Sequence, residues 1–448
     1  MNKSNKLPHV RSLALLAINR VEDDHAYTDL VLNSIFNDYD LHEQDRAFLS
    51  ELVRGTIRWK KKLDWIVNQL LTAPDKTPAV VKRILWTGLY QIIYMSRTPD
   101  FAAVNESVEL ARHTVHEKWS KVVNGVLRTF LRTYDKIKYP NANNDPVKYL
   151  AVMQSLPEWM VQRWLEQFGL AETSALCEAL NERPVLSIRV NELRIGIKDV
   201  EQEFSTHQVA FEHGQIDGFY RVHDSQSPIV RDFLESGRIT VQDESAGLVA
   251  RLTAPVENQV VFDLCAAPGG KSMHLAELAH DRALIISGDV NRSRAQMIAA
   301  ATRRLGITSV HPLVADAAAF PATAADVVVL DAPCSGMGVL HKKPDIRWQR
   351  NNKDITELTT LQFRLLTRAG GYVKKNGYLI YSTCTIDKDE NENLVQRFIK
   401  DNPQFTFCRP DSERIPAGFI IDDKYIRTWP HRHKMDGSFA VKLQKIGF

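Results

Sequence analysis

The sequence predicts a multidomain protein with an all-α N-terminal domain, a small α+β middle region and an α/β C-terminal domain. Apolar residues recur at helical spacing from residue 10 to about residue 135. After Gly247, near-continuous Val, Ile and Leu runs alternate with helical segments, which indicates a doubly wound sheet covered on both faces. A chain of 448 residues suits two or three domains. We therefore expect domains at residues 1–140, 147–240 and 241–448.

The first domain has an excess of positive charge. Residues 1–140 carry a net charge of +5, whereas the rest of the chain carries −2. Within "EQDRAFLSELVRGTIRWKKKLDWIVNQLL", helical spacing turns Trp59 and Trp65 toward the core and the cations outward. A polyanionic partner would suit this face, although a merely solvated basic face is the alternative. The candidate binding residues are Arg54, Arg58, Lys60, Lys61 and Lys62.

The middle region mixes strand-like and helical segments. The runs "VLSIRVN" and "GFYRVH" favour strands, and "IVRDFLESGRI" favours a helix. The polar stretch "YPNANNDP" at residues 139–146 predicts the linker that precedes this region.

Composition limits the classes of protein that fit. The chain is 44% hydrophobic and 25% charged, and its five cysteines include no CxxC pair. This indicates a reducing compartment and argues against disulfides or a zinc site. The N-terminal lysines precede an apolar run, "LALLAI", that is too short for a signal peptide, and no run is long enough to span a membrane. We expect a cytoplasmic protein without metal or membrane, and "PHRHK" at 430–434 lacks the acid or thiol that zinc would need.

A glycine turn follows the first strand of the C-terminal domain. In "FDLCAAPGGKSMHL" a strand ends at Asp263 and a helix begins near Lys271, so backbone N–H groups can face an anionic ligand. A P-loop remains an alternative, although Cys265 stands where that loop needs glycine. A dinucleotide site fits poorly because GxGxxG is absent.

S-adenosylmethionine fits this turn better, because it has a carboxylate, a ribose and an adenine but no phosphate. Asp289 ends the second strand 26 residues after Asp263, where an acid can accept from ribose hydroxyls. Asp316 ends the third strand and can accept from the adenine amino group. Each acid alone could instead be a helix N-cap. The expected cofactor contacts are Cys265, Ala266, Ala267, Pro268, Gly269, Gly270, Lys271, Asp289, Asp316 and Asp331.

Two further strands each deliver a cysteine. Cys334 follows a strand in "VVVLDAPCSGMG", and Cys384 follows another in "YLIYSTCTI", 50 residues later. A methyl donor beside two thiols suits carbon 5 of a pyrimidine, because a thiolate that adds to carbon 6 makes carbon 5 nucleophilic. Asp331 can orient the base or protonate its ring nitrogen. We expect Cys177 and Cys408 to be inert.

These motifs resemble those of the RNA 5-methylcytosine methyltransferases, the family that includes the Fmu/Sun and NSUN proteins. "DLCAAPGGK", "DAPCSGMG" and "YSTCT" are similar to its cofactor, first-cysteine and second-cysteine motifs, and "QDESAGLVA" and "DGSFAVKL" to its flanking motifs. The resemblance implies a Rossmann-like domain that binds S-adenosylmethionine, with Cys384 as the nucleophile and Cys334 assisting product release. It also implies a catalytic role for Lys271. DNA cytosine methyltransferases instead use the cysteine of the Pro-Cys motif, so the assignment depends on the family.

The N-terminal helices resemble the NusB-type RNA-binding domain. Together with the catalytic motifs, they are similar to the methyltransferase B subtype that acts on small-subunit ribosomal RNA. This implies methylation of 16S RNA, of the cytosine-967 type, by a monomer acting on naked RNA or on an assembling subunit. The alternative is a NusB-like RNA-binding factor with a vestigial catalytic domain. The intact pair of thiols and the three strand-end acids argue against it.

Overall fold

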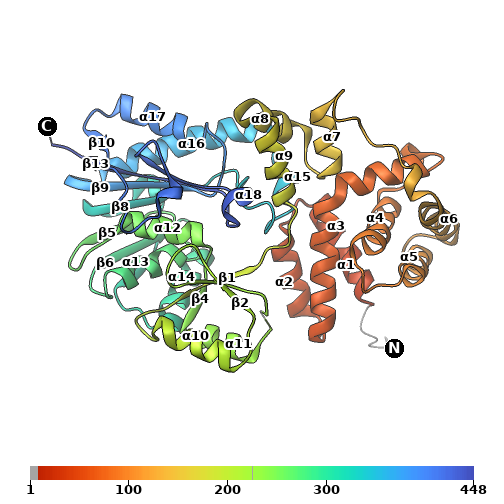
Figure 1. The fold of residues 1–448 in the computed structure, drawn as a ribbon, viewed down its shortest axis with the longest axis horizontal. Coiled ribbons are helices and arrows are strands. Elements are labelled where there is room, and N and C mark those ends of the chain that lie inside the picture. Colours follow the sequence, from red (N-terminus) through yellow and green to blue (C-terminus); the bar gives the residue numbers. More distant parts are fainter. Residues whose placement is uncertain (1–8, 225, 448) are drawn as a thin grey trace. The chain divides into compact units, whose positions relative to one another are not determined.

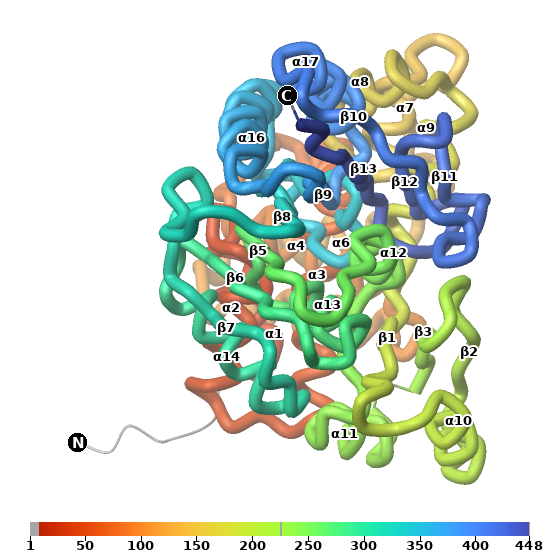
Figure 2. Tube along the Cα trace, turned by 90° about the vertical axis from the view of Figure 1, so that its left-hand side faces the viewer, coloured from red at the N-terminus to blue at the C-terminus, as the bar shows by residue number. Residues whose placement is uncertain are grey.

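The structure is a computed structural model that describes residues 9–224 and 226–447 (Figures 1 and 2). The lysines of the signal-like N-terminus, Lys3 and Lys6, lie outside these residues. The chain divides into two compact units. The first comprises the residues up to Asn181 together with Leu340–Asn351, and the second comprises Glu182–Val339 and the chain from Asn352 onward. No described helix has the length and apolarity needed to cross a membrane.

The first unit is helical, as the sequence predicts. Its long helix α3 contacts α1 and α4, and α5 packs on α6 (Figure 1). Gly55 in α3 allows this close packing, because a Cβ at that position would overlap the ring of Tyr90 in α4. The helices are α1 (Val10–Asp23), α2 (Thr28–Asp38), α3 (Glu43–Leu70), α4 (Ala79–Tyr94), α5 (Asp100–Thr114), α6 (Glu117–Thr133), α7 (Pro146–Met153), α8 (Glu158–Phe168), α9 (Leu170–Ala179) and α15 (Ile346–Gln349).

A late segment of the chain, residues 340–351, completes this helical unit. We call it the insert segment; it contains α15 and directly follows the Cys334 motif. Arg347 is fully buried there. Its guanidinium donates to Asn181 Oδ1 and to the backbone carbonyls of Arg58, Ser155, Leu180 and Leu340. The sequence predicted no such insertion.

The second unit begins with a small antiparallel sheet in the order β2-β3-β1-β4. Ile188, Phe204, Tyr220 and Phe233 share its buried core with the accompanying helices. The α+β character predicted for the middle region is therefore confirmed, although residues 147–181 of the predicted range 147–240 belong to the helical first unit. Strands β2 and β4 are too short to show a clear alternating pattern in the sequence. The elements are β1 (Leu186–Val190), α10 (Ile197–Thr206), β2 (Phe211–His213), β3 (Phe219–Val222), α11 (Pro228–Glu235) and β4 (Ile239–Val241).

The main sheet has nine strands in the order β11-β12-β13-β9-β8-β5-β6-β7, with β10 paired to β13. Strands β5 to β9 are parallel, as predicted, whereas β13 runs antiparallel to β9 and β12 antiparallel to β13. The strands are β5 (Val260–Asp263), β6 (Leu284–Asp289), β7 (Val310–Val314), β8 (Ala325–Asp331), β9 (Val373–Thr383), β10 (Phe405–Phe407), β11 (Ile420–Ile421), β12 (Tyr425–Thr428) and β13 (Ser438–Lys445).

Helices cover both faces of this sheet, which gives the Rossmann-like three-layer arrangement (Figure 1). Successive strand residues alternate between the two cores: Val261 and Val329 pack with α12 to α14, and Phe262 and Val328 with α16 and α17. The helices are α12 (Glu244–Thr253), α13 (Gly270–Leu278), α14 (Arg292–Leu305), α16 (Asn352–Gly371), α17 (Glu392–Asp401) and α18 (Pro430–His433).

Candidate active site

The predicted site residues gather where the strand order reverses. From β5 the chain continues through β6 and β7 on one side, then returns to β8 and β9 on the other. Ligands of open α/β sheets bind at such a switch point, beyond the carboxyl ends of the strands. Asp263 ends β5 and Asp331 ends the neighbouring β8. Ser382 lies in β9 and is the register partner of Asp331.

A lysine and an aspartate form an ion pair at this edge. Lys271 Nζ donates to Asp331 Oδ2 across 2.7 Å, and Ser382 Oγ donates to the other oxygen of Asp331 across 2.8 Å. Burial opposes the charge on Lys271, but the Asp331 carboxylate outweighs it and raises the lysine pKa. Lys271 is therefore a cation at neutral pH, and Asp331 is held in a fixed orientation.

The two predicted thiols meet. Sγ of Cys334 lies 3.1 Å from Sγ of Cys384, although the residues are 50 positions apart. Cys384 is exposed, whereas Cys334 is partly covered. The hydrogen bond with Cys384, together with burial, raises the pKa of Cys334 well above its usual range. Cys334 therefore keeps its proton, and Cys384 is the thiol that a substrate can reach.

A buried glutamate that the sequence analysis missed ties the two cysteine loops together. Glu390 accepts from the backbone N–H (2.8 Å) and hydroxyl (2.5 Å) of Ser335, next to Cys334. The Ser335 hydroxyl also lies 2.9 Å from Oγ1 of Thr385, next to Cys384. Gln362 donates to both Glu390 and the Pro333 carbonyl. No local pattern marks Glu390, because the partners of its carboxylate, Ser335 and Gln362, come from two other segments of the chain.

The other cysteines lack this setting. Burial raises the pKa of Cys177 and of Cys265 to about 12, so both remain thiols at neutral pH. Cys408 also has a raised pKa because it is partly buried.

The turn after β5 has the features that a cofactor cradle needs. Gly269 has φ +105°, a conformation that side-chain-bearing residues rarely adopt, and α13 begins at the next residue. Asp263 is fully buried; its Oδ2 accepts from Ser272, whereas Oδ1 has no hydrogen-bond partner among the described residues. Burial raises the pKa of this carboxyl to about 6. An unpartnered carboxylate oxygen suits a cationic donor such as the ammonium group of S-adenosylmethionine, so these residues fit that cofactor.

The two remaining acids differ in setting. Asp289 is only 3% exposed and lies 3.3 Å from Nη2 of Arg294, which also donates to the Ala267 carbonyl in the turn. Asp316 is exposed and accepts from Ala318 N, so it caps a short 3-10 helix. The capping alternative is therefore realised at Asp316, whereas Asp289 ends β6 and is linked to the turn through Arg294.

The α3 cations face intramolecular partners. Arg54 pairs with Asp29, Lys60 with Glu22 and Lys61 with Glu158, at 2.9, 2.5 and 2.9 Å. Lys62 lies over the ring of Trp59. Arg58 does not face outward as expected: it is 6% exposed and donates to the His341 carbonyl of the insert segment. RNA binding by the other four residues remains a prediction.

Trp59 packs inward as predicted, stacked on Tyr94 with ring centroids 4.7 Å apart. Trp65 is only half-buried and donates to the Lys138 carbonyl.

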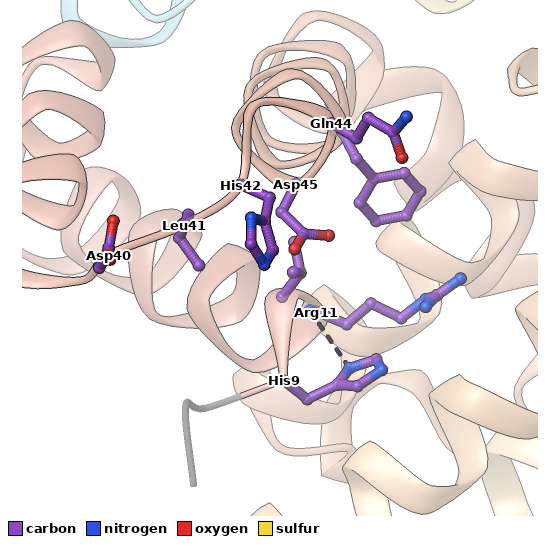
Figure 3. Close-up of a pocket in the computed structure, with 9 residues that line it drawn as sticks. His9, Arg11, Asp40, Leu41, His42, Gln44 and Asp45 are labelled. Atoms are coloured by element: carbon purple, nitrogen blue, oxygen red, sulfur yellow. Dashed lines mark hydrogen bonds between the residues drawn. The ribbon is translucent and has the colours of Figure 1, made fainter. Parts of the chain in front are cut away.

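Two other places show no catalytic arrangement. Within the "PHRHK" stretch, His433 Nδ1 accepts from the backbone of Trp429, and the described residues contain no cluster of three groups that could hold a metal. A cavity of about 530 Å³ in the first unit lies beside the start of α1 and the start of α3 (Figure 3). Its labelled side chains include His9, Arg11, His42 and Asp45, but no thiol.

Comparison with known proteins agrees with this architecture. The model of the 16S rRNA methyltransferase RsmB/F family matches residues 250–444, that of the NusB family residues 8–132, and that of the RsmF/B-like ferredoxin-like domain residues 156–218. Among solved structures, that of PH0851 has a TM-score of 0.78 and 26% identity, covering 99% of this chain and 100% of its own. That of NSun6 from Pyrococcus horikoshii with SFG has a TM-score of 0.58 at 22% identity, covers 66% of this chain and 100% of its own, and shows the fold alone.

Fold and site together define a methyltransferase that uses S-adenosylmethionine, joined to a NusB-like helical domain. Curated relatives identify the family. "Probable ribosomal RNA small subunit methyltransferase B" of Bacillus subtilis is 33% identical over 99% of this chain and 100% of its own length. "Ribosomal RNA small subunit methyltransferase B" of Cronobacter sakazakii is 31% identical over 98% and 99%. The chain belongs to the ribosomal RNA small subunit methyltransferase B family, which excludes the P-loop alternative.

Proposed function

We propose that the protein transfers a methyl group to carbon 5 of a cytosine in 16S ribosomal RNA, of the cytosine-967 type, through a covalent adduct with Cys384. One observation carries the covalent route: an exposed thiol lies 3.1 Å from a second thiol that keeps its proton. We further propose that the enzyme acts as a monomer without metal. The vestigial alternative would leave the contacts around Glu390 and the Lys271–Asp331 pair without a use.

The residues divide the reaction into two halves. In the first, the Cys384 thiolate uses an electron pair to form a bond to carbon 6 of the cytosine, and the displaced π electrons of the carbon 5–carbon 6 double bond make carbon 5 nucleophilic. Asp331, fixed by Lys271 and Ser382, orients the base or relays a proton from the Lys271 ammonium group to the ring nitrogen of the base. S-adenosylmethionine supplies the methyl group; the turn from Cys265 to Lys271, with Asp263 and Asp289, would hold it.

In the second half, water at the exposed site takes the proton from carbon 5, the electron pair of that C–H bond re-forms the carbon 5–carbon 6 double bond, and the carbon 6–sulfur bond breaks, which restores the aromatic ring. The electron pair of that bond returns to Cys384. A protonated thiol at 3.1 Å can donate to the departing sulfur, and this is the role we assign to Cys334. Because the target base must leave its stack to reach the thiols, unpaired RNA should react faster than paired RNA.

Bisulfite sequencing of 16S RNA tests the proposal. In a strain that lacks the gene, one cytosine should become fully convertible. A plasmid copy of the wild-type gene should restore the protection of this cytosine from conversion. A Cys408→Ala copy should restore it as well, because this control makes the same Cys-to-Ala change at a thiol outside the site. Cys384→Ala should not restore it. An unchanged methylation pattern in the deletion strain would refute the assignment.

A further inference from the structure

Helix α6 carries a row of cations along one face. Lys118, Lys121, Arg128 and Arg132 are spaced three, seven and four residues apart, which keeps all four within a sector of about 80° of the helix. Gly125 occupies the same face between them, and no atom lies within 4 Å of the position of a Cβ there. No other side chain interrupts the row.

The positive charge of this row is not neutralised. All four side chains are exposed. Arg128 Nε donates to the Asn124 amide oxygen across 2.9 Å, and Arg132 donates to the Thr129 hydroxyl across 3.3 Å; both acceptors are neutral. Within the part of the chain that the structure describes, none of the four makes an ion pair.

The surroundings do not cancel the charge either. Residues 117–138 contain six cations and two carboxylates, a net charge of +4 against +3 for the whole chain. Glu117, the carboxylate of α6, accepts from Arg112 Nε across 2.7 Å. Asp135 lies beyond the end of the helix. The positive potential of the first domain is therefore concentrated on this helix rather than on α3.

The opposite face of α6 holds the row in place. Val123, Val126, Leu127 and Phe130 are buried in the core of the first unit, where α6 contacts α4 and α5. The cations therefore project from a fixed backbone. On α3, by contrast, Arg54, Lys60 and Lys61 are paired with carboxylates, and Arg58 donates to a carbonyl. Contacts with aromatic rings occur on both helices, since Lys62 lies over the Trp59 ring and Lys118 lies 5.4 Å from the centroid of the Trp119 ring, and these contacts leave the charge in place.

We propose that the α6 cation row (Lys118, Lys121, Arg128 and Arg132) binds the phosphate backbone of the substrate RNA. This rests on the proposed RNA methyltransferase function and adds the surface that anchors the substrate. From Lys118 to Arg132 the helix rises about 21 Å, a length over which one strand of a duplex carries about six phosphates. Phosphate contacts fix the register of RNA without reading its sequence, so the row anchors an RNA whose target base is selected elsewhere.

A matched pair of variants tests this surface. One replaces all four row residues with Gln. The control replaces Lys76, Arg97, Lys198 and Lys400 with Gln, which removes the same charge from scattered exposed cations that form no ion pair within the described residues. For each protein, the affinity for a 16S RNA fragment is measured between 50 and about 200 mM salt. Thermal melting and the dissociation constant for S-adenosylmethionine verify that each variant is folded.

Loss of four phosphate contacts should make the log–log salt slope shallower by about 3, and should weaken RNA binding at low salt at least about tenfold. The KM for RNA should rise in parallel, while the control stays within about one unit of the wild-type slope. If the row variant and the wild type have equal salt slopes for RNA binding, while the wild type still transfers methyl groups to RNA, the RNA-binding role of the α6 cation row is wrong but the proposed function stands. If the row variant loses binding to an acidic protein while its RNA binding is unchanged, the proposed RNA-binding surface is also wrong. Absence of methyl transfer to RNA by the wild type would instead refute the proposed function.

Discussion

Arg347, in the insert segment, donates a hydrogen bond of 3.2 Å to the backbone carbonyl of Arg58 in α3. The chain leaves the second unit after Val339, contributes this arginine to the first unit, and returns at Asn352. Only five residues separate Cys334 from the start of the insert segment at Leu340. The first-cysteine loop is thus covalently tied to a segment that folds with the helical unit.

Arg347→Ala should destabilise the first unit strongly. The side chain is fully buried, and its loss would leave several carbonyls without a donor, each at a cost of about 1–3 kcal/mol. We expect the free energy of unfolding in urea to fall by at least about 3 kcal/mol. Arg350→Ala, in the same segment but only half-buried, should stay close to the wild type. Equal losses in both variants would show that the buried contacts of Arg347 contribute little.

The insert segment also changes what a deletion of residues 1–140 should do. The domain boundary that the sequence predicts at residue 140 implies that such a deletion leaves a folded methyltransferase. The deletion removes Ile57, whose carbonyl accepts from Trp348 Nε1 at 2.7 Å, and most of the core against which Trp348 packs. We now expect the truncated protein to bind the cofactor but to self-associate in size-exclusion chromatography. Replacing residues 340–351 with a Gly-Ser linker in the same truncation should restore a monomer, and continued association would contradict this account.

Asp289→Ala should weaken binding of S-adenosylmethionine at least about tenfold, because a charge-assisted hydrogen bond contributes about 1.5–3 kcal/mol. Isothermal titration calorimetry measures this directly. Asp316→Ala serves as the comparison, since that carboxylate is exposed and already caps a short helix, and we expect a smaller effect. If Asp316→Ala weakens binding more than Asp289→Ala does, the main cofactor contact is Asp316, which follows β7, rather than Asp289.

Local patterns predicted most of the residues that the structure brings together in the candidate site, and long-range contacts account for what was missed. The cofactor turn and both cysteines follow apolar strands directly, so the strand-end rule brought them to one edge. The environment of Arg58 depends on His341, and the role of Glu390 on Ser335 and Gln362, all of which lie far away in the sequence. The antiparallel strands at the sheet edge were also missed. The α6 cation row was also missed, but not because it depends on long-range contacts, since its helical spacing is visible in the sequence itself.

The buried carboxyl of Asp263 should leave a signature in stability against pH. Its pKa is about 6 in the folded protein, against a usual value of 3.8. The folded protein therefore binds more protons between about pH 4 and 6, and the free energy of unfolding falls as pH rises through that window. Asp263→Asn has no carboxyl group to titrate at this position. The free energy of unfolding of this variant, relative to that of the wild type, should therefore rise by about 3 kcal/mol from pH 4 to pH 7. Parallel urea profiles, measured without cofactor, would show that Asp263 does not titrate in this range.

The two thiols should respond oppositely to the same substitution. Cys384→Ala removes the exposed sulfur, so both methyl transfer and any covalent RNA adduct should disappear. Cys334→Ala leaves the nucleophile but removes the protonated thiol 3.1 Å from it, so attack and methyl transfer should proceed while release fails. This variant should accumulate a protein–RNA complex that survives denaturing electrophoresis and carries label from radioactive S-adenosylmethionine. Cys408→Ala should form no stable adduct and should methylate normally. A trapped adduct in Cys384→Ala but not in Cys334→Ala would reverse the two roles, and normal methylation by both variants would exclude covalent catalysis by these thiols.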